Sequence, residues 1–196
     1  MTDRPIPHPV ARASLAALAG IVLFAASLPV PASAQDKPSR AQIERGRYLV
    51  TTSGCHDCHT PMKMGANGPE PDMSRMLSGH PDALTMPPAP RLPEGPWLVV
   101  SAATNTAFAG PWGVSYSANL TPDTMTGLGQ WSLKDFQGTI RSGRHLGRGR
   151  EVLPPMPIPA YKHFNDADLG AIFAYLRSIP PVTNRVPEPT APMAAK

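Results

Sequence analysis

Cysteine, aromatic side chains and charged side chains are all scarce in this chain. Its 196 residues include two cysteines, 6% aromatic residues and 16% charged residues. A zinc site built on two cysteines needs two more soft ligands, and the chain has no other cysteine. The formal net charge of +4 comes without the clustered basic and aromatic side chains that nucleic-acid binding uses. We therefore expect no nucleic-acid partner.

Long hydrophobic runs are also missing. The apolar run at 15–28 has about 14 residues, short of the roughly 20 that cross a bilayer. Arg4 and Arg12 precede this run, and the small residues Ala-Ser-Ala at 32–34 follow it, a pattern typical of a secretory signal peptide. We expect cleavage after Ala34, export to the periplasm, and one domain at 35–196. An uncleaved segment that stays as a membrane anchor is the alternative.

The most specific motif present is Cys-His-Asp-Cys-His at 55–59. Two cysteines three positions apart, followed directly by a histidine, are the attachment signature of a c-type haem. In one helical turn Cys55 and Cys58 share a face, so both sulfurs can reach one porphyrin edge while His59 binds the iron. A redox dithiol of the thioredoxin kind would need a βαβ setting, which the flanking sequence lacks. A disulfide would span only two residues. The motif predicts one covalent haem c per chain.

Proline is unusually frequent, with 26 residues, so much of the chain is expected to be ordered loop that needs the haem to complete its core. Three helices are nevertheless predicted. The first begins at Ser39 and runs into the haem motif, the second begins at Ser132 and stops at Gly143, and the third begins at Asn165 and ends before Pro180. Each start carries a good N-cap residue.

This order of helix, haem motif, loops and terminal helix resembles the class I c-type cytochromes. The resemblance implies an all-α fold in which the N- and C-terminal helices cross beside the haem. Gly46 would allow close backbone approach at that crossing, with Phe173 or Tyr175 packed over it.

The resemblance covers residues 39–62 and 115–181, and it is weak between them. Residues 63–114 exceed what a minimal member of that family needs, which predicts a long loop-rich insertion. Within it, 97–101 and 106–108 are predicted to pair as a short hairpin.

The second iron ligand is predicted to be Met156, in the stiff sequence Leu-Pro-Pro-Met-Pro at 153–157. In the resembled family, a Met-Pro pair in this place supplies the iron with sulfur. Prolines also order the loop in advance, which lowers the entropic cost of holding a weak thioether ligand. Met125 is the next methionine to test.

Three histidines, His80, His145 and His163, are the other possible second ligands, although the surroundings of His80 and His145 indicate the surface. A copper site is a further alternative for the methionines crowded into the middle of the chain, but irregular hydrophobic packing is the commoner use of this side chain. Those methionines are Met62, Met64, Met73, Met76 and Met86.

Two further stretches, Asn-Leu-Thr-Pro-Asp at 119–123 and Gly-Leu-Gly-Gln-Trp at 127–131, resemble sequences in cytochrome subunits of periplasmic alcohol and gluconate-type dehydrogenases. The resemblance implies that they line the haem pocket, with Asn119 turning the chain and the Trp131 indole reaching a propionate. An Asx turn and an ordinary core tryptophan are equally open. Among four arginines at 141–150, Arg144 is the candidate to pair with a propionate.

Together these features predict an electron carrier rather than an enzyme. Ligands on both sides of the iron leave no open position for a substrate, and a methionine ligand raises the reduction potential. Family resemblance implies a dehydrogenase as donor and an oxidase or another cytochrome as acceptor, with membrane association only through partners or an uncleaved N-terminus. The alternative is a haem enzyme or gas-binding sensor with an open sixth site. A non-haem metal-binding module is the third hypothesis.

Overall fold

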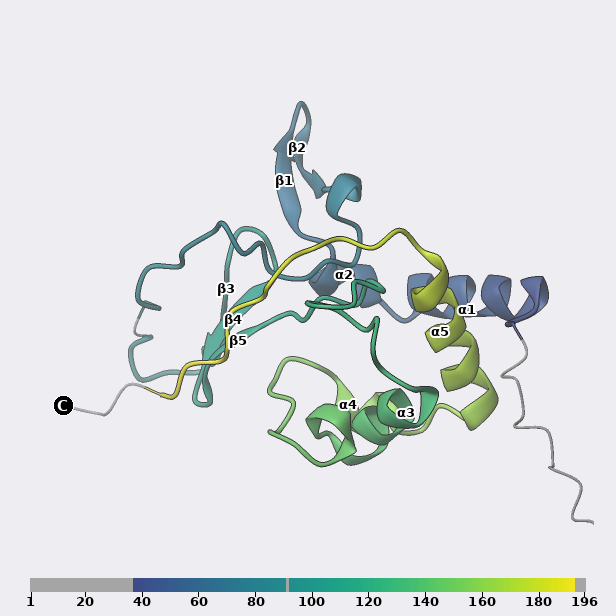
Figure 1. The fold of residues 1–196 in the computed structure, drawn as a ribbon. Helices are drawn as coiled ribbons and strands as arrows, with labels where there is room; N and C mark the ends of the chain where they lie inside the picture. The colour runs from purple at the N-terminus through teal and green to yellow at the C-terminus, as the bar shows by residue number, and fades with distance from the viewer. Residues whose placement is uncertain (1–36, 91, 193–196) are drawn as a thin grey trace, which may run out of the picture. The chain divides into compact units, whose positions relative to one another are not determined.

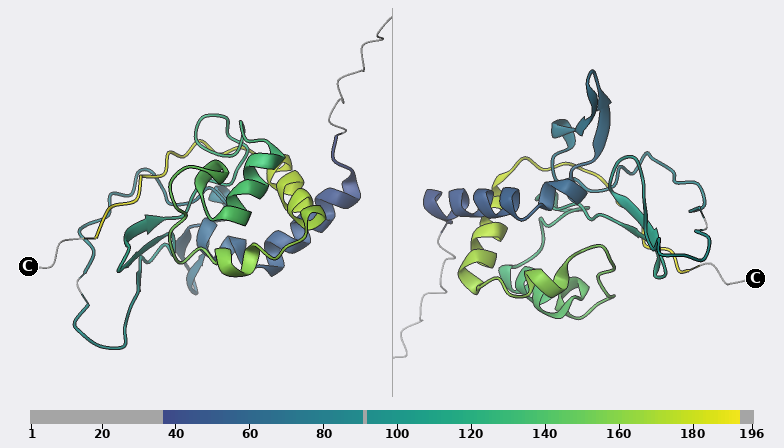
Figure 2. Two further views of the ribbon diagram at one scale, coloured as in Figure 1. Left: turned by 90° about the horizontal axis from the view of Figure 1, so that it is seen from below. Right: turned by 180° about the vertical axis from the view of Figure 1, so that it is seen from behind.

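The fold is known from a computed structural model that describes residues 37–90 and 92–192. The expected signal peptide at 1–34 lies outside the described residues. All the elements below belong to one compact unit, Lys37–Lys196 (Figures 1 and 2). Within the described ranges, no helix has the length and apolar character to cross a membrane.

The three longest helices that the structure describes each begin at a side-chain cap. They are α1 (Arg40–Thr52), α3 (Leu133–Ser142) and α5 (Asp166–Ser178). Ser39, Ser132 and Asn165 each accept a backbone N–H in the first turn, as the sequence predicted. Gly143 ends α3 in the left-handed conformation at φ 66°. All three predicted helices are present, but the first ends at Thr52 instead of continuing into the haem motif, because a turn at Ser53 and Gly54 interrupts it.

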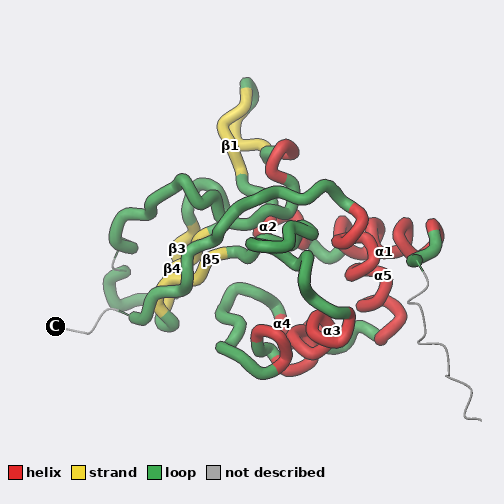
Figure 3. Tube along the Cα trace, in the orientation of Figure 1, coloured by secondary structure: helices red, strands yellow, loops and turns green. Residues whose placement is uncertain are grey.

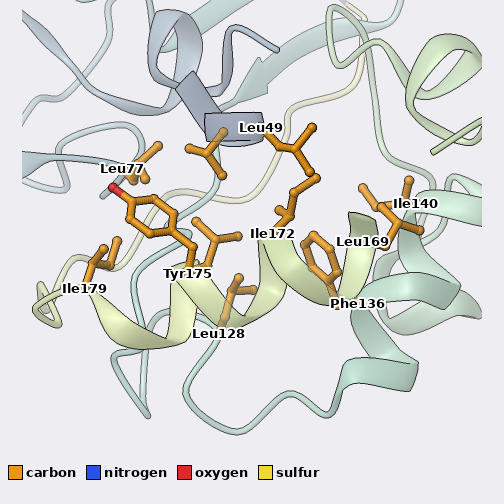
Figure 4. Packing of buried hydrophobic residues seen from close by; sticks show 11 residues of the cluster. Leu49, Leu77, Leu128, Phe136, Ile140, Leu169, Ile172, Tyr175 and Ile179 are labelled. Atoms are coloured by element: carbon orange, nitrogen blue, oxygen red, sulfur yellow. The ribbon is translucent and has the colours of Figure 1, made fainter. Parts of the chain in front are cut away.

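Helices α1 and α5 pack directly against each other, and Gly46 lies at their closest approach. A Cβ atom at Gly46 would lie 2.6 Å from the carbonyl carbon of Ala171 and 2.8 Å from Cβ of Tyr175. The predicted close contact at Gly46 is therefore present. Around it lies a single hydrophobic cluster along α5 (Figure 4), which includes Leu49, Leu169 and Leu176.

The expectation of an all-α fold is wrong, because the unit contains two antiparallel β-sheets (Figure 3). The first is a two-stranded hairpin of β1 (Met62–Gly65) and β2 (Gly68–Pro71), in which Gly65 pairs with Gly68. The second has the order β3–β4–β5, with β3 at Val100–Ser101, β4 at Ala107–Gly110 and β5 at Gly113–Tyr116. These strands form because tight turns fold short extended segments back on themselves.

Most of the second sheet lies in the segment at 63–114, which was expected to be mainly loop. The predicted hairpin is confirmed in part: Ser101 pairs with Phe108, but 97–99 is not in a strand. The methionines of this region do not share one environment, because Met76 packs against the core whereas Met64 is 78% exposed.

Short elements complete the unit. Helix α2 (Cys55–His59) follows α1 after a turn at Gly54, and α4 (Ile158–Tyr161) precedes α5. Two 3₁₀ turns, η1 (Met73–Arg75) and η2 (His145–Gly147), lie in the loops.

After α5 the chain continues as an extended segment, residues 179–190, which we call the strap. It leads from α5 toward the three-stranded sheet (Figure 1), where Thr190 forms an antiparallel bridge with Val114.

Candidate functional site

A cavity of about 510 Å³ lies between α2, the loops on either side of α3, and the strap. Its volume falls in the range typical of small-molecule and cofactor sites. Both cysteines, His59 and Met156 line it, together with Asn119 and Trp131. Side chains separated by about a hundred positions in the sequence therefore meet at one site.

Helix α2 presents the three residues of the haem motif to this cavity. Gly54, in the left-handed conformation at φ 71°, turns the chain out of α1 so that α2 can begin at Cys55. One helical turn then places Cys55 and Cys58 on the same side, both half-buried and both free thiols. Among the described residues, no three His, Cys, Asp or Glu side chains gather as metal ligands. The structure thus gives the cysteines no companions for a zinc site.

Burial determines the protonation state of the two thiols. Burial raises the pKa of Cys55 to about 11 and also raises the pKa of Cys58. Redox-active cysteines instead have a lowered pKa, because the thiolate is the reactive form. These thiols are protonated at neutral pH, which disfavours a dithiol redox centre.

The His59 imidazole is held in one orientation and one tautomer. It is buried, and its Nδ1 lies 2.8 Å from the carbonyl oxygen of Ala118. A carbonyl only accepts, so Nδ1 carries the proton and the lone pair is left on Nε2. Burial is the main cause that lowers the pKa of His59, and the hydrogen bond to Ala118 partly opposes it. A neutral histidine fixed through Nδ1 is the form that binds a metal through Nε2.

Met156 reaches the cavity from the loop before α4. It is half-buried and packs against the hydrophobic cluster. Its loop is fixed to the second sheet, because the Ser115 hydroxyl donates to the carbonyl oxygen of Pro154 at 2.5 Å. Met125 also lines the cavity, but its side chain is 69% exposed. Of the two methionines that line the cavity, Met156 is the more buried.

The three other histidines considered as iron ligands, His80, His145 and His163, lie in very different places. His80 is fully buried, with Nδ1 2.9 Å from Oγ1 of Thr106 and Nε2 3.2 Å from the carbonyl oxygen of Leu84. The prediction that His80 lies on the surface is therefore wrong. His145 is half-buried and lines the cavity beside Trp131, with the ring centroids 5.0 Å apart. His163 is exposed and outside the cavity lining.

Asn119 and Trp131 both line the cavity but differ in their bonding. The buried Asn119 amide donates to the carbonyl oxygen of Val182 at 2.8 Å and accepts from the backbone of Thr121 at 3.0 Å. It therefore joins the 119–123 loop to the strap. The Trp131 indole N–H has no hydrogen-bond partner within the described part of the chain and is free for a ligand.

Arg144 does not line the cavity. Its guanidinium donates to the carbonyl oxygen of Gly149 at 3.0 Å, within its own loop. Two other arginines, Arg150 and Arg185, line the cavity instead, and Arg150 pairs with Glu188 at 3.2 Å. Sequence spacing could not show which arginines line the cavity. Arg185 and Glu188 belong to the strap, which lies beside Arg150 only in the folded chain.

Tyr161 is a further lining residue that the sequence did not single out as part of the site. Its hydroxyl donates to the carbonyl oxygen of Ser53, just before α2. Burial, with smaller contributions from Cys55, Cys58 and Asp57, raises the pKa of Tyr161 to about 12. This hydrogen bond joins α4, which follows the Met156 loop, to the turn before α2, which carries the two cysteines.

Sequence comparison relates this chain to subunits of several dehydrogenases. It is 31% identical over 150 residues to a subunit of nicotinate dehydrogenase from Pseudomonas putida, covering 76% of this chain and 10% of that protein. It is 29% identical over 163 residues to the gluconate 2-dehydrogenase cytochrome c subunit of Pantoea cypripedii, covering 83% of this chain and 29% of that protein. The chain is also 29% identical over 168 residues to the cytochrome c subunit of alcohol dehydrogenase (quinone) of Gluconobacter oxydans, covering 84% of this chain and 27% of that protein. No family model matches.

The chain is thus related to cytochrome c proteins. More particularly, its relatives include cytochrome c subunits of dehydrogenases. This confirms, at the level of sequence, the resemblance to cytochrome subunits of alcohol and gluconate-type dehydrogenases. The chain spans about a tenth to three tenths of the length of these relatives.

The residues at the cavity fit a haem c. Two neutral thiols on one helical face, a histidine with its Nε2 lone pair free, and a half-buried thioether from a different loop all line the same apolar-walled space. These are the donors that covalent attachment and axial ligation require.

Proposed function

We propose that this chain is a periplasmic electron-transfer protein with one haem c. Cys55 and Cys58 attach the haem, and His59 and Met156 are its axial ligands. The observation that supports this best is that all four side chains line one cavity. A signal peptide at 1–34, cleaved after Ala34, belongs to the same proposal, since the attachment motif and export support one another.

The chain's own residues do three things at this site. Cys55 and Cys58 would hold the haem, since each thiol S–H can add across one vinyl group to give a thioether without any oxidant. The Ala118 carbonyl keeps the proton of His59 on Nδ1, so that Nε2 is available to the iron. Met156 is held by its proline-rich loop and by the bond from Ser115 to Pro154, which reduces the entropy lost when a weak ligand is fixed.

When bound, the haem supplies a one-electron couple. The protein keeps water from it with apolar side chains from α3 and α5, among them Phe136, Leu169 and Ile172. Met156 as a ligand would favour the reduced iron, and the neutral His59 would be the other ligand. With both residues bound, the iron would have no open position for a substrate, which is why we propose an electron carrier and not an enzyme.

The haem propionates would meet the polar rim of the cavity. Arg150, Arg185 and the free indole N–H of Trp131 are the donors there. Arg185 forms no ion pair among the described residues, so its guanidinium can bind a carboxylate in bidentate fashion. Arg144 has no place in this proposal. Asn119 shapes the wall by fixing its own loop.

The electron partners follow from the relatives. Several relatives are named as cytochrome c subunits of dehydrogenases, so we propose a dehydrogenase as donor and a component of the respiratory chain as acceptor. The exposed arginines near the cavity provide a basic rim for an acidic partner.

The decisive experiment is on the purified full-length product. We expect haem that stays attached after denaturation, one per chain, with a low-spin spectrum that carbon monoxide does not change. Haem that separates on denaturation would contradict the attachment through Cys55 and Cys58.

A Met156→Ala variant then tests the sixth ligand. It should bind carbon monoxide in the reduced state, whereas Met64→Ala, which removes an exposed methionine outside the cavity lining, should behave as the wild type. Ready gas binding to the wild type would instead favour an enzyme or gas sensor with an open sixth site. An unchanged Met156→Ala spectrum would transfer the ligand role to Met125 or His145.

A further inference from the structure

The strap contains one side chain whose hydrogen bonds are all satisfied in the protein interior. Asn184 is fully buried. Its amide group donates to the carbonyl oxygens of Ser78 at 2.7 Å and His80 at 2.8 Å. Its carbonyl oxygen accepts from the Arg75 guanidinium at 2.6 Å and from the backbone N–H of Asp82 at 2.9 Å. One amide thus fixes the backbone of residues 75–82 at several points.

The segment that Asn184 holds is the support of His59. The backbone N–H of Gly79 donates to the carbonyl oxygen of His59 at 2.8 Å. The next residue, His80, donates its backbone N–H to the carbonyl oxygen of Ser117 at 2.9 Å. Ser117 directly precedes Ala118, whose carbonyl oxygen binds Nδ1 of His59.

Gly79 makes this arrangement tight. It has φ 79°, and a Cβ atom there would overlap the backbone of Ser117 and lie 2.6 Å from the carbonyl carbon of Ala118. The segment at 77–80 therefore lies directly against the peptide that presents the Ala118 carbonyl. Because the two backbones are in contact and the His80 N–H donates to the Ser117 carbonyl oxygen, we expect a shift of this segment to be transmitted to the peptide that carries the Ala118 carbonyl.

We propose that Asn184 is a positioning residue for the axial ligand His59, acting through the 77–80 segment and the Ala118 carbonyl. The inference rests on the proposed function, since it requires His59 to bind the haem iron. Asn184 touches neither the iron nor the cavity: it is absent from the cavity lining, although its neighbour Arg185 belongs to it.

The consequence is electronic as well as structural. A hydrogen bond from Nδ1 to a carbonyl makes the imidazole a stronger donor to the iron, which stabilises the ferric state. When Asn184 is removed, the Ala118 carbonyl loses one of its supports, although the bonds from Ser117 N–H to Thr106 and from Leu120 N–H to Leu77 remain, and we expect the hydrogen bond to His59 to weaken. The ferric state is then less favoured, so the reduction potential rises.

The test compares two asparagine-to-alanine variants of the haem-loaded protein. In Asn184→Ala we expect the ratio of ferrous to ferric protein at a fixed solution potential to rise by up to about tenfold, because losing a group that holds a metal ligand directly costs about 10–100-fold in metal affinity and Asn184 acts one step further away. For a one-electron couple that corresponds to about 59 mV. We also expect faster solvent exchange of the His59 Nδ1 proton, measured by NMR of the ferrous protein.

Asn165→Ala is the matched control. It removes the amide that caps α5, at an exposed site outside the cavity lining, and so it lowers stability without reaching His59. Its potential and Nδ1 exchange should equal those of the wild type. If Asn184→Ala loses stability but keeps both wild-type values, Asn184 is merely structural and the proposal is overturned.

Two further outcomes are informative. If Asn184→Ala does not fold, Asn184→Ser takes its place, because it keeps a hydroxyl donor in the same buried site. The reduction potential and the exchange rate of the His59 Nδ1 proton are then measured in Asn184→Ser, and wild-type values of both overturn the proposal. A wild-type protein without covalent haem overturns this inference together with the proposed function. A wild type with haem and unaltered Asn184 variants overturns this inference alone.

Discussion

Replacing Gly46 by alanine gives the sharpest test of how α1 and α5 pack. The added Cβ would lie 2.6 Å from the Ala171 carbonyl carbon and 2.8 Å from the Tyr175 Cβ, and nearer still to the Ala171 oxygen. These neighbours are backbone or a first side-chain carbon, so they cannot rotate away and the helices must separate. Such overpacking costs up to about 3 kcal/mol. Alanine recovers about 1 kcal/mol of helix propensity, which leaves a net loss of about 2 kcal/mol.

Gly170→Ala is the control for this prediction. Gly170 lies in α5, where a Cβ would meet only Nε2 of Gln42 at 3.7 Å and Cδ2 of Leu133 at 4.0 Å, ordinary contact distances. Only the higher helix propensity of alanine then matters, so Gly170→Ala should raise the free energy of unfolding by about 1 kcal/mol. Denaturant unfolding followed by far-ultraviolet circular dichroism measures both variants. Equal stabilities of Gly46→Ala and Gly170→Ala would refute the account of the helix contact.

Three further predictions concern the loops around the cavity. Hydrogen bonds, chiefly from Thr126, lower the pKa of the Asp123 carboxyl group in the folded protein. Its contribution to stability is therefore complete above the ordinary carboxyl pKa and is lost as the pH falls through the lowered folded value. Asp123→Asn should make the stability, measured by unfolding at a series of pH values, fall less steeply in acid. Arg177 donates to the carbonyl oxygens of Leu128, at 2.9 Å, and Gly129, so Arg177→Met should cost about 1–3 kcal/mol and speed amide exchange in that loop. Tyr161→Phe should lower stability by about 1 kcal/mol in thermal unfolding, and an unchanged melting temperature would show that its bond to the protein contributes nothing.

The helices could be predicted from the sequence because their signals are local. Ser132 and Asp135 form a reciprocal capping box, and Gly143 ends the helix in the conformation that glycine favours. The haem motif is local for the same reason, since one turn of helix determines its geometry.

The strands and the histidine environments depend on contacts that local sequence does not contain. The β1–β2 hairpin has only four residues in each strand and little alternation, although Asn67 beside Gly68 is a recognised turn signal that could have indicated it. His80 is buried because its ring packs against Tyr116 of the second sheet, with the centroids 4.9 Å apart, and bonds to Thr106. The place of Arg150 at the cavity also depends on a distant segment, because its guanidinium pairs with Glu188 of the strap.

The strap also has a kinetic consequence. Asn184 bonds to the backbone of Ser78, 106 positions earlier, so one wall of the cavity forms only when this distant segment arrives. Closing so long a loop is slow, because its entropy is lost before the contacts form. Before that step, α1 and α2 can fold locally and present the thiols on an open side. If the chain attaches a haem as proposed, this order of folding would leave the cysteines accessible to it until the strap closes.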